Sequence, residues 1–234
     1  MEHITGLLST NPASAPLDKK VAGAIPKLHM LSSSKLFIRT EKKFWLEENG
    51  KPRADIPQVI LTDRGPCNVF CINYDDFTDH GIVVVSYTWG DESTKLQGMS
   101  PQERLEECKN VIQEVSPEFA ENLVPVNDEI HCTDWQARNN QHGAFKFLSA
   151  GQEDSQNELY HHYLGVTHQD DKPHSGVFLA GDSVGYCGGW AESAVISSVN
   201  AALAIAAHFG GTPADDSPLK QDKDKYNYGG RRRQ

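Results

Sequence analysis

The sequence predicts an α/β protein, in which a mixed sheet flanked by helices makes up most of the chain. Residues 34–45 alternate apolar and polar side chains, as a half-buried strand does, and residues 81–88 are a short apolar run rich in valine. Residues 100–115 and 190–209 carry apolar residues at helical spacing instead. The 234 residues, 38% of them hydrophobic, suffice to bury a core.

The first strand is followed by a turn and then by shorter apolar segments. Asn49-Gly50 and Pro52 provide the turn, because glycine and proline interrupt regular structure. Three further strands are predicted: residues 59–62, 68–73 and 81–88.

Ser100, Pro101 and Glu103 mark the start of a helix. Serine caps the first turn, proline suits the first helical position, and a glutamate three residues after the serine completes a capping box. The helix ends before Pro117. Its apolar face comprises Leu105, Cys108, Ile112 and Val115.

The second half of the chain is predicted to alternate strands, loops and one long helix. We expect a strand over residues 129–135, a loop over 139–152 and a buried strand over 176–181. Residues 190–209 form a helix that is apolar on nearly every face and dense in alanine, so we expect it to pack inside a larger body. Disorder is expected from residue 215 onward.

Composition and charge exclude several classes of protein. The formal net charge of −10 argues against a nucleic-acid partner, which would require a basic surface. No run of eighteen apolar residues predicts a membrane span, and the first residues do not resemble a signal peptide. The five cysteines are irregularly spaced and predict reduced thiols in a cytoplasmic protein. The histidine spacings fit no metal site, so no metal is expected.

The segment 177–194 has the residue types of a cofactor site. Asp182 follows a predicted strand and can accept hydrogen bonds from sugar-like hydroxyls. Gly188 and Gly189 allow close approach of the backbone, and the free N–H groups at the start of the next helix favour negative charge. The alternative is an ordinary strand–loop–helix crossover with glycines for tight packing.

Four segments, in order, resemble the flavin amine oxidases. The segment 177–194 resembles the C-terminal flavin-binding signature of that family. Lys35-Leu-Phe-Ile-Arg-Thr-Glu-Lys-Lys-Phe-Trp resembles its Lys-(x)6-Lys-x-Phe-Trp strand, and Val83-Val-Val-Ser-Tyr-Thr-Trp-Gly-Asp-Glu resembles a second strand. Asp134-Trp135, Gly143-Ala-Phe-Lys-Phe and Gly151-Gln152 complete the series. The branch containing tryptophan 2-monooxygenase and related bacterial L-amino-acid monooxygenases is the most similar.

The resemblance covers only the C-terminal half of the family's chain. It implies a partial first segment (residues 1–30), a substrate-binding domain (31–170), the last strand and helix of a Rossmann-like FAD domain (171–213) and a disordered tail (214–234). The family's Gly-x-Gly-x-x-Gly fingerprint is missing, since the chain contains no Gly-x-Gly. We therefore expect either one part of a split or processed enzyme, with a second chain carrying that half of the FAD site, or a fragment. A homo-oligomer is also possible.

The resemblance implies a role for each matching residue. Lys35 would hold a water near flavin N5, and Trp190 and Phe145 would form the two walls of an aromatic cage. Tyr87 would bind the substrate carboxylate, and the Gly189 carbonyl would receive the amino group. Asp182 would bind the ribityl hydroxyls. Further contacts with FAD are expected from Gly181, Gly189, Trp190, Ala191, Glu192 and Trp135. Ala144 stands where monoamine oxidases attach flavin to a cysteine, so the FAD is expected to be noncovalent.

The implied reaction is oxidation of an L-α-amino acid by FAD and O2. An oxidase would release a keto acid, ammonia and peroxide, whereas a monooxygenase would give an amide; the resemblance favours the monooxygenase. Core packing remains an alternative for Phe145, Trp190 and Trp135, a plain core hydrogen bond for Tyr87, and an exposed strand lysine for Lys35. Two alternatives concern the whole chain: a non-catalytic remnant or partner-binding subunit without flavin, and an amine or polyamine oxidase.

Overall fold

The computed structural model describes residues 17–73, 79–166, 177–212 and 214–216. The chain divides into two compact units. The sheet unit comprises Leu31–Ala144, and the helical unit comprises Met1–Met30 together with Phe145–Gln234. The expected disordered tail lies almost wholly outside the described residues, as does most of the partial first segment.

The sheet unit contains a five-stranded sheet with the strand order β3-β4-β5-β2-β6. All of the described neighbouring strands pair antiparallel, so the sheet is not mixed as we expected. The short connections from β3 to β4 and from β4 to β5 favour antiparallel pairing of these three strands. The strands are β2 (Ser33–Thr40), β3 (Val59–Leu61), β4 (Asn68–Ile72), β5 (Gly81–Trp89) and β6 (Ile130–Asp134).

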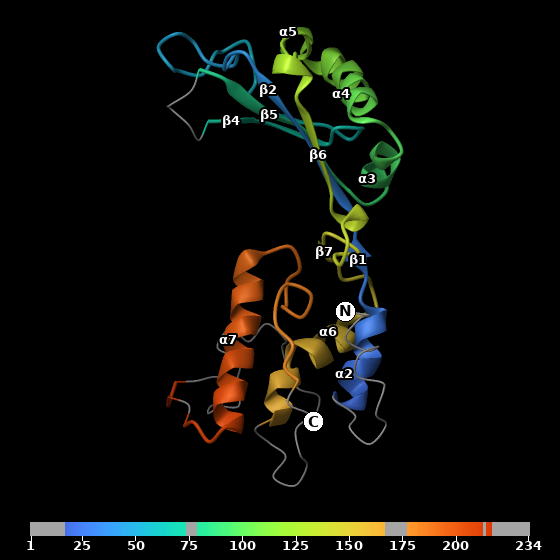
Figure 1. The fold of residues 1–234 in the computed structure, drawn as a ribbon, viewed down its shortest axis with the longest axis vertical. Helices are drawn as coiled ribbons and strands as arrows, with labels where there is room; N and C mark the ends of the chain where they lie inside the picture. Colours follow the sequence, from blue (N-terminus) through green and yellow to red (C-terminus); the bar gives the residue numbers. More distant parts are fainter. Residues whose placement is uncertain (1–16, 74–78, 167–176, 213, 217–234) are drawn as a thin grey trace. The chain divides into compact units, whose positions relative to one another are not determined.

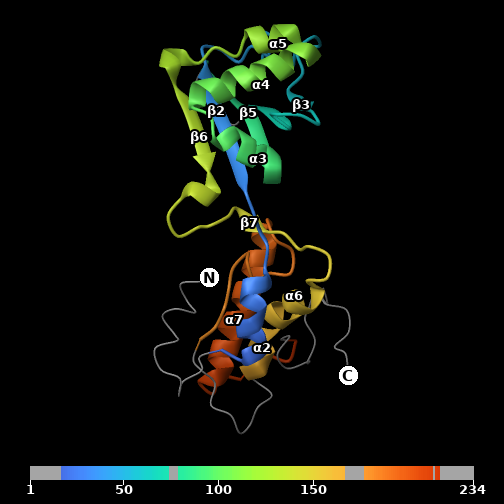
Figure 2. The same ribbon diagram turned by 90° about the vertical axis from the view of Figure 1, so that its right-hand side faces the viewer.

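Helices cover one face of this sheet (Figures 1 and 2). They are α3 (Gly90–Gln97), α4 (Pro101–Val115) and α5 (Pro117–Glu121), followed by the short 3-10 turns η2 (Val126–Asp128) and η3 (Trp135–Ala137). The predicted capping box of α4 is present: Ser100 Oγ accepts from Glu103 N–H at 3.3 Å, and the Glu103 carboxylate accepts from Ser100 N–H at 2.8 Å. The core between helices and sheet includes Leu36, Ile38, Val83, Val85, Leu105, Ile112 and Phe119.

The first predicted strand is shorter than expected. It ends at Thr40, where the side chain donates to the Lys42 carbonyl at 2.9 Å and helps to turn the chain. Phe44 and Trp45 leave the sheet and enter the core, where Phe44 packs edge-on against Phe119 at 5.2 Å between ring centroids. Burial of these two rings outweighs continuation of the strand.

The helical unit is built around two small apolar clusters. Val21 of α2, Leu159 of α6 and Leu179 share one of them, and Tyr163 and Ala204 belong to the other. The unit contains α2 (Lys19–Ala24), η1 (Ile25–Lys27), α6 (Glu153–Tyr160), η4 (His162–Val166) and α7 (Ala191–His208). A two-stranded sheet pairs β1 (Met30–Leu31) with β7 (Phe145–Lys146).

By compactness the chain divides between Ala144 and Phe145. Helix α6 packs with α2 and Leu179 within the helical unit. The expected domain bounds at residues 30, 170 and 213 concern function and stay predictions. Assignment of the two units to substrate and FAD binding stays a prediction.

One prediction for the C-terminal region needs correction. Residues 177–181 form no strand; their backbone is satisfied by side chains, because Leu179 N–H donates to His162 Nε2 at 2.9 Å and Gly181 N–H donates to Ser197 Oγ at 3.0 Å. Within this chain, helix α7 is buried on one side and its other side exposes Val195 and Val199, so its packing inside a larger body stays a prediction. Of the helices in the described ranges, none has the length and apolar character to cross a bilayer.

Candidate functional site

The loop before α7 brings three predicted site residues together in the helical unit. Asp182 Oδ1 accepts a hydrogen bond from Gly189 N–H at 2.7 Å, so the carboxylate closes the loop on itself. Gly189 has a φ of +81°, and a β-carbon there would lie 3.3 Å from the Phe145 ring. Gly181, at the other end, has a φ of +110°. Both ends of the loop thus require glycine.

The start of α7 presents an aromatic ring and free backbone donors. Trp190 is the N-cap residue, makes no side-chain capping hydrogen bond and is 67% exposed. Ala191 and Glu192 follow in the first turn and are exposed too. The N–H groups at a helix start carry partial positive charge and favour an acceptor group. This end of the helix can therefore receive a polar, flat molecule.

Lys146 is a residue of this region that the sequence analysis missed. It lies in β7, next to Phe145, and is only 3% exposed. Its Nζ donates to the Gln156 side-chain oxygen and to the Gly185 carbonyl. Burial lowers the pKa of the Lys146 ammonium to about 8, although the Asp182 carboxylate acts in the opposite direction. The sequence feature that could have identified Lys146 is its place between two phenylalanines in the Gly143-Ala-Phe-Lys-Phe motif.

The sheet unit brings two more predicted residues together. Lys35 on β2 and Tyr87 on β5 are register partners, and Lys35 Nζ lies 4.4 Å from the centre of the Tyr87 ring. Tyr87 also packs edge-on against Trp89 at 5.4 Å. Both Lys35 and Tyr87 are half-buried, so each can reach a small molecule at this end of the strands.

In the described part of the sheet unit, the structure shows no side-chain contact between Trp135 and another predicted site residue. It starts η3 directly after β6, and the Arg138 guanidinium lies 5.2 Å from its ring centre. A stacked arginine of this kind is typical of a partly exposed tryptophan. Its expected place near the flavin stays a prediction.

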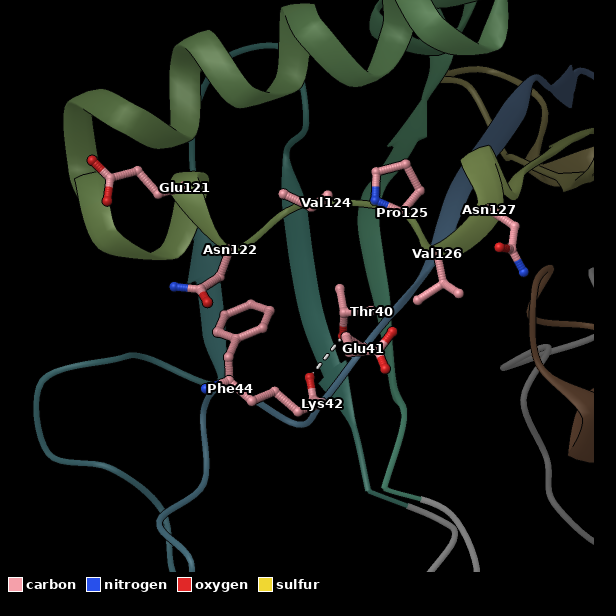
Figure 3. A pocket seen from close by; sticks show the side chains of 10 residues that line it. All are labelled: Thr40, Glu41, Lys42, Phe44, Glu121, Asn122, Val124, Pro125, Val126 and Asn127. Carbon is pink, nitrogen blue, oxygen red and sulfur yellow. Dashed lines mark hydrogen bonds between the residues drawn. The ribbon is translucent and has the colours of Figure 1, made fainter.

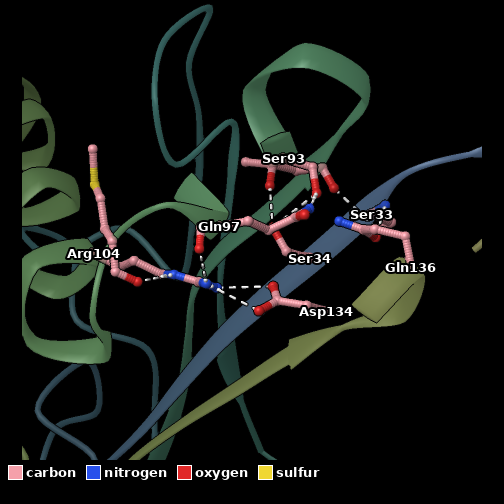
Figure 4. A network of polar contacts seen from close by, with 9 residues as sticks. Ser33, Ser34, Ser93, Gln97, Arg104, Asp134 and Gln136 are labelled. Carbon is pink, nitrogen blue, oxygen red and sulfur yellow. Dashed lines mark hydrogen bonds and ion pairs between the residues drawn. The ribbon is translucent and has the colours of Figure 1, made fainter. Parts of the chain in front are cut away.

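A polar network supports the strand ends that carry Lys35 and Trp135 (Figure 4). Arg104 of α4 binds the Asp134 carboxylate through both terminal nitrogens, at 2.8 and 2.9 Å, and this ion pair is largely buried. Ser34 of β2 shares hydrogen bonds with Thr88 at 2.9 Å and Ser93 at 3.1 Å. The network fixes the spacing of β2, β5 and β6 at this end.

A pocket of about 350 Å³ lies elsewhere in the sheet unit, between the end of β2 and the segment after α5 (Figure 3). None of its lining residues is a predicted site residue. They are Thr40, Glu41, Lys42, Phe44, Glu121, Asn122, Val124, Pro125, Val126 and Asn127. The pocket is therefore no candidate for the predicted chemistry.

No group of three or more His, Cys, Asp or Glu residues suited to a metal ion occurs among the residues with a described position. The five cysteines are free, and burial raises the pKa of the Cys71 and Cys108 thiols to about 12. These two thiols are consequently protonated and unreactive near neutral pH.

Comparison with known proteins identifies the family. The sequence profile described as flavin containing amine oxidoreductase matches residues 6–206. The chain belongs to this family. Membership implies a flavin and confirms the resemblance found in the sequence.

Individual relatives refine the comparison. Tryptophan 2-monooxygenase of Agrobacterium vitis is 36% identical over 88% of this chain and 27% of its own length. The enzyme of the same name from Pseudomonas savastanoi is 31% identical over 91% of this chain and 38% of its own. L-amino-acid oxidase of Mus musculus is 25% identical over 92% of this chain and 31% of its own. The chain thus spans between a quarter and two fifths of these relatives, which is less than the half that we expected.

Solved structures agree on the fold. A triple mutant of putrescine oxidase superimposes with a TM-score of 0.57 at 13% identity, over 84% of this chain and 39% of its own. Wild-type putrescine oxidase bound to putrescine gives a TM-score of 0.53 at 14% identity, over 81% of this chain and 38% of its own. At this identity the likeness concerns the fold alone, and it agrees with the predicted α/β class.

Proposed function

We propose that this chain forms part of an FAD-dependent enzyme that oxidises an L-α-amino acid. The observation that carries the proposal is the pairing of Lys35 with Tyr87 on neighbouring strands. A cation and a phenolic hydroxyl at one strand end are suited to a substrate carboxylate and to reduction of oxygen. Similarity to tryptophan 2-monooxygenases over most of the chain supports the same reaction class.

The described residues of the helical unit fit one edge of an FAD site. The N–H groups at the start of α7 have no side-chain cap, and Trp190 offers an exposed aromatic face. Asp182 accepts two backbone N–H groups and, since a carboxylate has about four acceptor positions, could also accept ribityl hydroxyls. FAD would be held without a covalent bond, because Ala144 offers no nucleophile. Gly181, Gly189, Ala191 and Glu192 would complete the helical unit's share of the site. Trp135 is proposed as the FAD contact of the sheet unit.

Each residue of the chain has a distinct task in the proposed reaction. Tyr87 would donate a hydrogen bond from its hydroxyl to the substrate carboxylate, and the Gly189 carbonyl would accept a hydrogen bond from the substrate amine. Phe145 and Trp190 would exclude water around the α-carbon. Bound FAD would supply the hydride acceptor and the place where O2 is reduced. Lys35 would hold a water there and stabilise negative charge on oxygen.

A second polypeptide would supply the Gly-x-Gly-x-x-Gly half of the FAD site. The exposed side of α7 supports this part of the proposal. Between the exposed Glu192 and His208 it carries three large apolar side chains, with exposed fractions of 60% at Val195, 51% at Val199 and 39% at Ile205. An apolar stripe of this length is typical of a surface that another protein surface covers.

The test is the visible absorbance spectrum of the purified chain, alone and co-expressed with a polypeptide that carries the fingerprint half. A suitable polypeptide is the part of the Pseudomonas savastanoi enzyme that lies outside its region of similarity to this chain. We expect flavin only on co-expression, and bleaching by an L-amino acid without oxygen. Stoichiometric flavin on the lone chain would contradict the need for a second polypeptide. No flavin in either sample would favour the non-catalytic remnant.

We further propose the monooxygenase outcome, because the tryptophan 2-monooxygenases of Agrobacterium vitis and Pseudomonas savastanoi are more than 30% identical to this chain. The amino acid and O2 would then give the amide, CO2 and water. Mass spectrometry of the products decides: an amide with one oxygen atom from labelled O2 supports the proposal. A keto acid with peroxide would indicate an oxidase, and turnover of an amine that has no carboxylate would indicate an amine oxidase.

A further inference from the structure

Lys146 touches the loop of residues 181–189 at three separate points. Its backbone N–H donates to Asp182 Oδ2 at 3.4 Å, and its Nζ donates to the Gly185 carbonyl. Its own carbonyl lies so close to Gly188 that a β-carbon on Gly188 would overlap it. One residue of β7 therefore contacts the start, the middle and the end of this loop.

The end of the Lys146 side chain is buried between two acceptors. These acceptors are the Gly185 carbonyl and Gln156 Oε1 of α6. The amide nitrogen of Gln156 in turn donates to the Gly185 carbonyl at 3.0 Å and to the Tyr186 carbonyl at 2.9 Å. Lysine is rarely buried to this degree, and a buried amine is tolerated only where its N–H groups are satisfied. These contacts tie the loop to α6 through the two side chains.

We propose that Lys146 is a positioning residue, which fixes the conformation of residues 181–189 and so orients Asp182 and Gly189 toward cofactor and substrate. Lys146 acts through the loop, because its amine is buried against Gln156 and the Gly185 carbonyl. What the loop binds rests on the proposed function. That Lys146 holds the loop in place rests on the contacts alone.

The first experiment is hydrogen exchange on the purified chain with Lys146→Met, which keeps most of the aliphatic stem and removes the amine. We expect exchange of the peptide covering residues 182–189 to rise about tenfold, while β5 and the C-terminal half of α7 keep their rates. The matched control is Lys20→Met, which removes an exposed lysine from the same unit and should change neither region.

The second experiment separates positioning from a merely structural role. In the complex with the fingerprint half, we expect Lys146→Met to raise the Kd for FAD about tenfold, measured on the folded fraction. A lysine that only stabilised the unit would lower the folded fraction and leave this Kd unchanged. If the wild-type complex binds no flavin, the proposed function fails, and the exchange experiment still tests the positioning role.

A second variant covers the possibility that Lys146→Met does not fold. Gln156→Ala removes one acceptor of the amine and two donors to the loop, so exchange of the same peptide should rise several-fold. Unchanged exchange in either folded variant would overturn the proposal. So would an equal rise of exchange throughout the helical unit, because it would show general destabilisation.

Discussion

Lys35 and Tyr87 occupy the same register position of β2 and β5, so their relative placement is set by the strand pairing itself. A cation beside the site of oxygen reduction stabilises the negative charge that develops there. We expect Lys35→Met, in the reconstituted enzyme, to slow reoxidation of reduced flavin by O2 roughly 10²-fold, the effect typical of removing one charge-stabilising donor. Flavin reduction by the substrate should change far less.

Stopped-flow absorbance measures the two half-reactions separately. Lys42→Met is the control, because Lys42 is exposed in the turn after β2. Equal slowing of both half-reactions by Lys35→Met would contradict a specific role in oxygen reduction.

Lys146 makes the stability of the chain depend on pH in a defined direction. Its folded-state pKa of about 8 lies below the ordinary value of 10.5, so folding favours the neutral amine. The free energy of unfolding should therefore rise as pH increases from about 8 to 10.5, by up to about 3 kcal/mol. Below pH 8 this contribution is absent.

Urea unfolding at several pH values between 7 and 10.5 measures this dependence. Tyrosines and other lysines titrate in the same range, so the comparison is with Lys146→Met at each pH. The difference in unfolding free energy between the two proteins should grow in favour of the wild type as pH rises. A constant difference would show that the pKa of Lys146 is not lowered.

At the scale of the elements, the Arg104–Asp134 pair joins α4 to the end of β6. Removing one member of a buried ion pair leaves the other charge without a partner, which typically costs about 3–5 kcal/mol. We expect Arg104→Met to lower the free energy of unfolding by roughly 3 kcal/mol, because Asp134 is partly accessible. The matched control is Arg64→Met, which breaks the exposed Arg64–Glu114 pair and should cost less than about 1 kcal/mol.

Urea unfolding of both variants at neutral pH measures this difference. Similar losses in the two variants would mean that the buried pair contributes no more than a surface pair does.

At the scale of the whole molecule, the exposed side of helix α7 is the proposed contact surface for the second polypeptide. Since Val199 is exposed in the chain alone, Val199→Glu should change its free energy of unfolding by no more than about 0.5 kcal/mol. In the complex with the fingerprint half, the same charge would be buried, so we expect co-purification to be lost. Val115→Glu alters an equally exposed valine at the end of α4 and should leave the complex intact.

Affinity co-purification and thermal unfolding together measure this prediction. An intact complex with Val199→Glu would show that α7 is not the contact surface. Loss of stability in the lone variant would instead show that residues of this chain already cover the helix.

Local signals in the sequence determined the α/β class, the strands of the sheet unit and the start of α4. Alternation, turn residues and a capping box act within a few residues of the chain, so they can be identified without knowing the fold. The same holds for the family, because its motifs are contiguous segments. Lys35 and Tyr87 were identified by these motifs.

Only the tertiary structure decided which distant residues meet. Pairing of β2 with β5 set Lys35 against Tyr87, and packing of Phe44 and Trp45 ended the first strand early. Packing of the helical unit buried Lys146. It also let side chains of His162 and Ser197, instead of a neighbouring strand, accept from the backbone N–H groups of Leu179 and Gly181. These outcomes depend on competition between burial and hydrogen bonding across the whole chain, and no short segment contains that information.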